Sequence, residues 1–324
     1  MVKEALLQVM KRSIKTTVID WAVYVAVRVA ICIVQALPRR FLERQARQWS
    51  YFLAYKVNIR RDVVLDNIER SFPDWTEAEC HEAGRAMWEH LLLMVIEIAH
   101  APRVIRKTTW RRYLRIEGLE LLIRTLWLDR PKVVLSGHYG NFELAAFLFG
   151  VFGLKLFSVA RELDNPFLDQ FVTEFRESRG QKILPKKGSA PDVAAVLEEN
   201  GAIGLLGDQA AGRKGCRVDF FGRPASVHKA IGVFALSSEA PVMVCTATRR
   251  DGLFSFDLRV EGVMDPREDR PEVESLTDLS QWYTTLLEGA VRRRPDQYWW
   301  VHRRWRCFAQ PPKKPRNSEK QAVA

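Results

Sequence analysis

The residues best suited to chemistry are a histidine and a carboxylate, His138 and Glu143, in the stretch PKVVLSGHYGNFE. A neutral imidazole that faces an oriented carboxylate can act as a general base. On one continuous helix, side chains five positions apart diverge by about 140°, so the pairing needs a turn between them. Gly137 and Gly140 can supply it. A lone histidine after a strand is more often structural, so the pair alone leaves both interpretations open.

The elements that must position this pair are a strand and a helix. Residues 133–135 form an apolar strand that should place His138 at its carboxyl end, and the apolar run 144–152 predicts a buried helix. Asn141 is a favourable N-cap for that helix. Glu143 would then lie in the first turn, where the helix dipole favours the ionised carboxylate.

Further short strands end beside Arg161 and beside Asp208 and Gln209, and helical segments separate them. This alternation predicts an α/β fold with a mainly parallel sheet covered on both faces. Ligands bind such sheets at the carboxyl ends of the strands. We therefore expect these three residues to lie on the same edge of the sheet as His138.

The flanking regions carry different patterns. We predict helices throughout residues 40–128, a helix over 226–238 after a Gly-rich basic loop, an edge strand within 251–262, and a long closing helix from about 276. The prediction for 40–128 makes this part a scaffold that covers the sheet.

A covalent nucleophile has no support in the sequence. No GxSxG motif is present, and no cysteine lies in a catalytic signature. Ser136 is only two positions from His138 on a strand, so its side chain should point to the other face or crowd the ring. We therefore expect His138 to take a proton from an acceptor hydroxyl, which attacks an activated acyl group such as a thioester. Arg161 or backbone amides near Gly140 would stabilise the oxyanion.

The chain resembles the bacterial lipid A biosynthesis (lauroyl/myristoyl) acyltransferases, a branch of the lysophospholipid acyltransferase superfamily. The resemblance covers roughly residues 116–305 and rests on the order of the blocks IEGLELL, GHYGNFELA, R-x3-NP, R-x2-RG, GDQ, VDFFGRPA and PDQYWWVHRRW. In that family the His and acid of HxxxxE form the catalytic dyad, which here are His138 and Glu143. It implies a mostly parallel central sheet flanked by helices, as in glycerolphosphate acyltransferases.

The resemblance also implies substrates and a location. Acyl carrier protein or coenzyme A would carry the donor thioester, and the acceptor would be a membrane glycolipid at the cytoplasmic face of the inner membrane. Neither a cofactor nor a metal is expected. The residues expected to contact substrate are Gly140, Asn141, Arg161, Asn165, Arg176, Asp208, Gln209 and Arg217. Arg217 and its basic neighbours suit a phosphate-bearing acceptor, with a solvated loop as the alternative.

Charge is concentrated at the two ends of the chain. The first 50 residues carry +6 and residues 291–324 carry +8, so the remainder carries −3. No nucleic-acid-binding module is recognisable, and the basic ends are rich in tryptophan and aliphatic residues. An anionic membrane surface, with no nucleic-acid partner, is therefore the expected contact of these ends.

The longest apolar run, residues 21–38, is interrupted by Arg28. A helix of this length is marginal for crossing a bilayer. We predict a shallow or short membrane anchor with Arg28 snorkelling, and a buried core helix is the alternative. The expected organisation is a basic membrane-associated segment (1–40), an acyltransferase domain (41–308) and a disordered basic tail (309–324).

The five cysteines are far apart, without a CxxC pair or metal-ligand spacing, which indicates a reducing compartment. The favoured function is a membrane-associated O-acyltransferase of the lipid A type. The alternatives are an acyltransferase for a lysophospholipid or another glycolipid, and a non-catalytic protein that binds the membrane surface.

Overall fold

The computed structural model describes residues 13–57, 59–269, 273 and 275–308. The basic residues 1–12 and the predicted disordered tail 309–324 lie outside the described residues. Within them the helices are α2 (Ile14–Ala36), α3 (Arg39–Phe52), α4 (Arg61–Ser71), α5 (Glu77–Val104), α6 (Leu119–Trp127), α7 (Phe142–Val151), α8 (Pro166–Glu177), α9 (Ala190–Glu198), α10 (Lys229–Ser237) and α11 (Leu276–Arg293). Shorter turns of helix are η1 (Leu53–Val57), η2 (Trp110–Arg112) and η3 (Pro295–Gln297).

The strands form one large sheet and one small hairpin. They are β1 (Leu114–Glu117), β2 (Lys132–Ser136), β3 (Leu156–Ala160), β4 (Lys182–Pro185), β5 (Ala202–Leu206), β6 (Cys216–Phe220), β7 (Arg223–Val227), β8 (Val242–Arg249) and β9 (Phe256–Met264). The described part of the large sheet has the strand order β1-β9-β8-β2-β5-β3-β4. Five of its strands, β2, β3, β4, β5 and β8, run in one direction, and β9 and β1 run in the other. The predicted mostly parallel sheet is confirmed.

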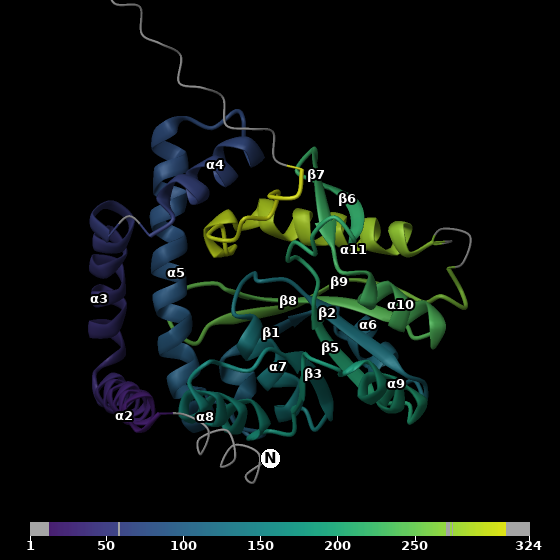
Figure 1. Ribbon diagram of the computed structural model, residues 1–324, viewed down its shortest axis with the longest axis horizontal. Coiled ribbons are helices and arrows are strands. Elements are labelled where there is room, and N and C mark those ends of the chain that lie inside the picture. Colours follow the sequence, from purple (N-terminus) through teal and green to yellow (C-terminus); the bar gives the residue numbers. More distant parts are fainter. Residues whose placement is uncertain (1–12, 58, 270–272, 274, 309–324) are drawn as a thin grey trace, which may run out of the picture.

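Helices cover both faces of this sheet (Figure 1). The central strand β2 shows why, because its side chains alternate between two apolar cores. Val133 and Leu135 belong to the core beneath α10 and α11, and Val134 belongs to the core beneath α6 and α7. A strand buried on both faces is a continuous apolar run in sequence, as residues 133–135 are.

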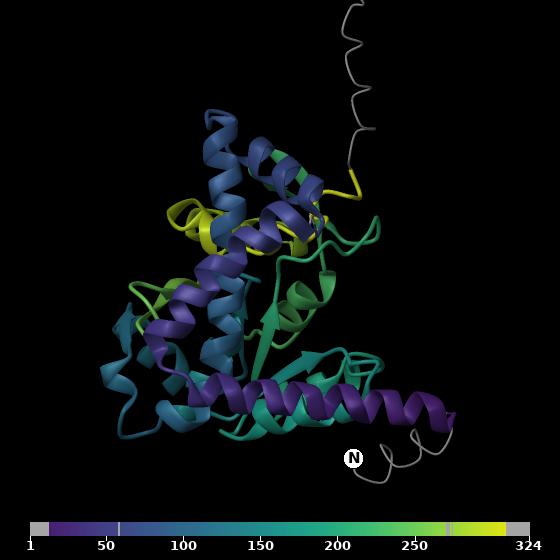
Figure 2. The ribbon, with the colours of Figure 1, turned by 90° about the vertical axis from the view of Figure 1, so that its left-hand side faces the viewer.

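Helix α5 stands upright along one end of the sheet, with α3 and α2 outside it (Figures 1 and 2). It begins with a capping box between Thr76 and Glu79. Met87, near its middle, packs in the core under α11, and Ala101, near its end, packs in the core under α7. The helix therefore ties the two layers together at the edge where the candidate site lies.

Two segments differ from the sequence-based prediction. Residues 114–117 form β1 instead of helix, because Gly118 adopts φ +78° and separates the strand from α6, and because β1 pairs with β9. Residues 223–227 form β7, which pairs with β6 across the two-residue turn Phe221-Gly222, where both φ angles are positive. The expected helix therefore begins only at Lys229, and β9 is an inner strand instead of an edge strand.

Helix α2 lies against the outside of the domain. None of its residues is buried, so the alternative of a buried core helix is wrong. It is long and apolar enough to cross a membrane. Asn165 Nδ2 donates to the Asp20 carbonyl near one end (2.9 Å), and Gln35 Nε2 donates to the Ala99 carbonyl near the other (2.5 Å). The helix is therefore held along the domain at two points about 22 Å apart along its axis.

Candidate active site

His138 lies just beyond the carboxyl end of β2, at the centre of the sheet. Its Nδ1 is 2.7 Å from Asp208 Oδ1, and its backbone N–H donates to Asp208 Oδ2 at 2.9 Å. Asp208 follows β5, which is the parallel neighbour of β2. Because parallel strands end at the same edge, two residues 70 positions apart meet there.

The carboxylate bonded to the histidine is therefore Asp208, and not Glu143 as the sequence-based hypothesis required. Glu143 instead accepts from Arg176 Nε at 3.0 Å and from Arg176 Nη2 at 2.5 Å. The first turn of α7 brings Glu143 to α8, which carries Arg176. Glu143 remains close enough to His138 for its charge to raise the pKa of the imidazole.

The electrostatics fix the protonation of the pair. Burial alone lowers the pKa of His138, but the charge and hydrogen bond of Asp208 outweigh it, and the pKa is raised. Burial would raise the pKa of Asp208, yet the charge of His138 and its two hydrogen bonds lower it to about 2. Asp208 is therefore ionised at neutral pH. Because a carboxylate only accepts hydrogen bonds, neutral His138 carries its proton on Nδ1 and a lone pair on Nε2.

Three side chains lie close to the imidazole of His138. The side-chain amide nitrogen of Gln209 lies 3.0 Å from His138 Nε2, and the rings of Phe142 and Trp299 lie with their centroids 5.0 Å from the imidazole. Trp299 also donates its backbone N–H to the His138 carbonyl (3.0 Å). Only 12% of the His138 side chain is exposed.

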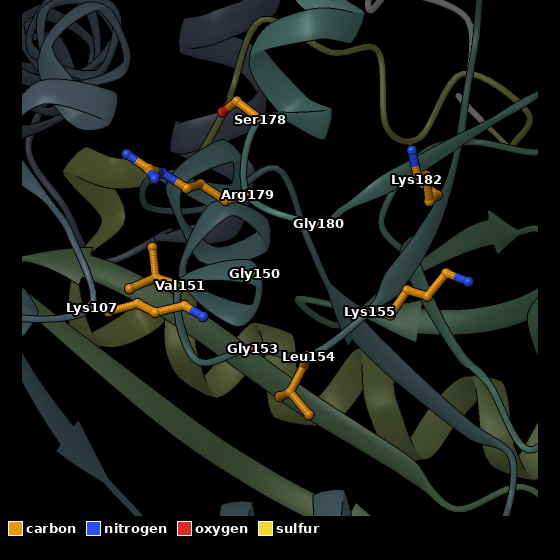
Figure 3. A pocket seen from close by; sticks show the side chains of 10 residues that line it. All are labelled: Lys107, Gly150, Val151, Gly153, Leu154, Lys155, Ser178, Arg179, Gly180 and Lys182. Atoms are coloured by element: carbon orange, nitrogen blue, oxygen red, sulfur yellow. The ribbon is translucent and has the colours of Figure 1, made fainter.

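Two cavities lie elsewhere. One, of about 450 Å³, is lined by residues around the ends of α7 and α8, among them Lys107, Lys155 and Lys182 (Figure 3). The other, of about 540 Å³, runs along α2. Neither of these two cavities is lined by His138.

The turn that carries His138 is held by backbone contacts. Gly140 adopts φ +59°, and a Cβ atom built there would lie 2.1 Å from the Ala247 carbonyl oxygen. The Gly140 N–H donates to the Gln297 carbonyl (2.9 Å), and the Asn141 N–H donates to Ala247 (2.7 Å). These two amides are therefore used within the fold and are not available to stabilise an oxyanion.

A buried polar network also holds the turn that carries His138. Glu97 is completely buried and accepts from Arg249 Nε and Nη2, both at 2.6 Å, and from Asn141 Nδ2 at 2.9 Å. Arg249 also lies 2.9 Å from His90 Nδ1, and His90 Nε2 lies 3.1 Å from the Gly140 carbonyl. Burial, with the Arg249 charge, lowers the pKa of His90 to about 3, so this histidine is neutral. Since Arg249 donates to Nδ1, Nε2 carries the proton and donates to Gly140.

Asn141 has a positioning role in this arrangement. Its Oδ1 accepts from the Leu144 N–H and caps α7, while its amide binds Glu97. The cap was predicted from the sequence, but the network was not. A signal for it was available, since Glu97 is the one acid in the apolar run LLLMVIEIAH.

Three residues expected to contact substrate lie outside the group of side chains around His138. The Arg161 side chain is 80% exposed and 3.7 Å from Asp164. Asn165 caps α8 by accepting from two backbone N–H groups, and its amide binds α2. Arg217 is exposed on β6, over the ring of Phe308. Arg161 and Arg217 do not contact His138, because their elements direct them away from the centre of the sheet.

Phe142 and Trp299 fall in characteristic blocks of the sequence, but nothing local to them indicates that both lie against His138. Trp299 comes from the chain after η3, more than 150 residues from His138. Its only local signal is the aromatic block YWW. Among the described residues, no three His, Cys, Asp or Glu side chains gather in a way that could hold a metal ion.

Comparisons with known proteins identify the family of the chain. The model of the family described as bacterial lipid A biosynthesis acyltransferase matches residues 9–307. The chain is 24% identical over 258 residues to lipid A biosynthesis palmitoleoyltransferase of Escherichia coli, covering 76% of this chain and 79% of that protein. It is 28% identical over 227 residues to phosphatidylinositol mannoside acyltransferase of Mycobacterium tuberculosis, covering 66% and 67%.

Among solved structures, the 1-acyl-sn-glycerophosphate acyltransferase PlsC of Thermotoga maritima aligns with 81% of this chain and 99% of its own, at 13% identity and a TM-score of 0.39.

Proposed function

Because the chain belongs to the bacterial lipid A biosynthesis acyltransferase family and is an acyltransferase, we propose that it transfers a fatty acyl chain from a thioester to a hydroxyl of a lipid A precursor or related glycolipid. The donor is carried by acyl carrier protein or coenzyme A. The observation that supports this most is the buried Asp208–His138 pair at the carboxyl edge of the sheet.

His138 is the general base of the proposed reaction. Asp208 accepts from Nδ1–H and leaves Nε2 as the nitrogen that takes a proton. Asp208 also binds the backbone N–H of the same residue, so it fixes the ring in one orientation. As the proton arrives, the buried carboxylate stabilises the imidazolium.

The acceptor hydroxyl attacks the thioester carbonyl as its proton moves to His138 Nε2. The tetrahedral intermediate then collapses, the carbon–sulfur bond breaks, and the thiolate leaves. The imidazolium returns the proton to the thiolate, so base and proton balance over one turnover. Ser136, the nearest serine in sequence, donates its Oγ–H to the Gly137 carbonyl (3.5 Å) and not to His138, which favours direct transfer over an acyl-enzyme.

Glu143 and Arg176 form the second functional pair. Their side chains are 19% and 23% exposed. Two hydrogen bonds hold the guanidinium in place, and its remaining N–H groups suit an anionic group such as an acceptor phosphate or the oxyanion. The pair thus replaces Arg161 as our candidate for binding negative charge.

Lipid mass spectrometry tests the proposal. Membranes of cells that produce the protein should contain a glycolipid one acyl chain heavier than in cells without it, and the His138→Ala protein should not form it. A phosphatidylinositol mannoside is the second acceptor class to be tested, because the mycobacterial relative is named for it. Unchanged lipids in both backgrounds, together with no transfer by the purified protein from acyl thioesters to either glycolipid, would reject the proposal.

We further propose that α2 holds the enzyme on the cytoplasmic face of the inner membrane by lying along the surface. Several of its apolar side chains are exposed, among them Trp21 (55%) and Ile33 (55%). Its one central charge, Arg28, does not extend outward as the snorkelling prediction required. The guanidinium donates to Tyr24 Oη (2.9 Å) and lies 5.0 Å from the centre of the Phe171 ring on α8. The exposed apolar side chains of α2, with basic residues beside them, suit the boundary between lipid headgroups and acyl chains.

Topology distinguishes lying from crossing. A spanning α2 would put the N-terminus on the opposite side of the membrane from the catalytic domain. In spheroplasts, a membrane-impermeant maleimide should therefore leave a Val2→Cys variant unlabelled, and labelling only after lysis is the expected result. Labelling of intact spheroplasts would show that α2 crosses.

A further inference from the structure

The side chain of Gln209 is hydrogen-bonded to Nε2, the atom of His138 that the reaction needs. Its side-chain nitrogen is 3.0 Å from His138 Nε2, while Asp208 holds Nδ1 at 2.7 Å. Because ionised Asp208 requires the proton on Nδ1, the amide N–H of Gln209 donates to the lone pair on Nε2. Both ring nitrogens of the base are therefore engaged, and no hydroxyl can use Nε2 until Gln209 moves.

The position of Gln209 allows it to move. It directly follows Asp208 in the segment after β5, and its side chain is partly exposed, unlike that of Asp208. Within the described part of the chain, its side chain forms no hydrogen bond other than that to His138. One neutral hydrogen bond is therefore all that an incoming group has to replace.

The chemistry explains why such a contact is useful. If a thioester binds while Nε2 is open, water can take the place of the acceptor. Its oxygen bonds to the carbonyl carbon, its proton goes to Nε2, the carbon–sulfur bond breaks, and the imidazolium protonates the thiolate. The products are a free fatty acid and a thiol, and the activated acyl group is lost.

On this basis we propose that Gln209 prevents water from using His138 as a general base. Its amide is hydrogen-bonded to Nε2 in the absence of acceptor, and the acceptor hydroxyl displaces it. Acyl transfer is thereby favoured over thioester hydrolysis. This inference rests on the proposed function, because it assigns to the same base a second, suppressed reaction. It also explains why the imidazole is closed in by Phe142 and Trp299 as well as by Gln209.

The test measures hydrolysis and transfer separately in the full-length protein. With acyl-coenzyme A alone, Gln209→Ala should release free thiol at least about 10-fold faster than the unmodified protein, since general-base catalysis becomes available to water. With acceptor present, the KM for acceptor should fall by about 2- to 10-fold, the worth of one neutral hydrogen bond that no longer has to be displaced. Gln170→Ala is the matched control, because Gln170 is an exposed glutamine whose amide bonds only to Glu174 on the same helix.

A second variant distinguishes protection of His138 from water from a simple role of Gln209 in substrate binding. Gln209→Glu keeps the shape but puts a carboxylate against Nε2, which stabilises the imidazolium and raises the pKa of His138. Both reactions should then fall at neutral pH and recover as the pH rises. Thermal unfolding of each variant confirms that the fold is retained.

The outcomes are distinct. If Gln209→Ala lowers transfer without increasing hydrolysis, Gln209 only binds substrate and the inference is wrong. An unchanged pH profile for Gln209→Glu would also overturn it. If the unmodified protein transfers no acyl chain to any glycolipid, the proposed function fails instead. In that case NMR titration still decides the contact, because His138 must show a higher pKa in Gln209→Glu than in the unmodified protein.

Discussion

Replacement of Asp208 by asparagine tests the positioning of the base most directly. The two carboxylate oxygens accept from two different donors of His138, the backbone N–H at 2.9 Å and the ring Nδ1–H at 2.7 Å. An asparagine has only one oxygen for these two donors. If that oxygen accepts from the backbone, the amide N–H₂ faces Nδ1, and the ring must move its proton to Nε2, where it can no longer act as a base.

The alternative orientation is also unfavourable. If the asparagine oxygen accepts from Nδ1, its N–H₂ faces the backbone N–H, and a buried donor is left without a partner at a cost of about 1–3 kcal/mol. The wrong tautomer should therefore dominate. The same substitution in a Ser-His-Asp triad lowers kcat by about 10⁴, and we expect Asp208→Asn to lower kcat here by about 10³ to 10⁴.

The assay is transfer of a radiolabelled acyl chain to glycolipid across a range of pH. Activity requires neutral His138, so it rises as the pH passes the pKa of the imidazole. Asp208 raises that pKa, so its loss should move the acid limb of the profile to lower pH while the plateau falls. Asp74→Asn, at an exposed aspartate, is the matched control. A plateau within about tenfold of the unmodified protein would refute the role of Asp208.

Three further predictions concern the surrounding structure. Glu143→Gln and Arg176→Gln should each lower transfer by about 10- to 100-fold. The double variant should be no less active than the less active single variant, because both changes break the same ion pair. Additive losses in the double-mutant cycle would contradict this. Gly140→Ala should lower Tm by at least about 4 °C in a thermal scan, because the added Cβ meets a carbonyl at 2.1 Å, whereas Gly153→Ala, also at positive φ but with open space around it, should cost less. Glu97→Gln should reduce the free energy of unfolding by about 3–5 kcal/mol in urea titration, because it leaves a buried arginine unpaired, and a loss below about 1 kcal/mol would show that the pair is dispensable.

The two pairs of the site, Asp208 with His138 and Glu143 with Arg176, differ in how exposed their carboxylates are. Asp208 is 6% exposed and Glu143 is 19% exposed at the side chain. A buried carboxylate can orient an imidazole without competition from water, whereas a more accessible ion pair can exchange one partner for a substrate anion. The division follows from placement: one acid ends a central strand, and the other begins a helix.

The sequence by itself determined the features that depend on local rules. The apolar run 133–135 predicts the central strand, and Asn141 before an apolar run predicts the start of α7, because strand burial and helix capping act over a few residues. The alternation of strands and helices likewise predicted the parallel sheet and the edge at which His138 and Asp208 lie. The resemblance of the ordered blocks identified the family.

Only the tertiary structure decided which side chains meet. Asp208, rather than the nearby Glu143, bonds to His138 because β2 and β5 are neighbours in the sheet, and Trp299 reaches the same ring from the far end of the chain. Arg28 turns to an aromatic ring on α8, and β1 is a strand because β9 offers it a partner. A hydrogen bond or ion pair depends on distances of a few ångströms between residues far apart in sequence, and these distances are set by packing, which no local pattern records.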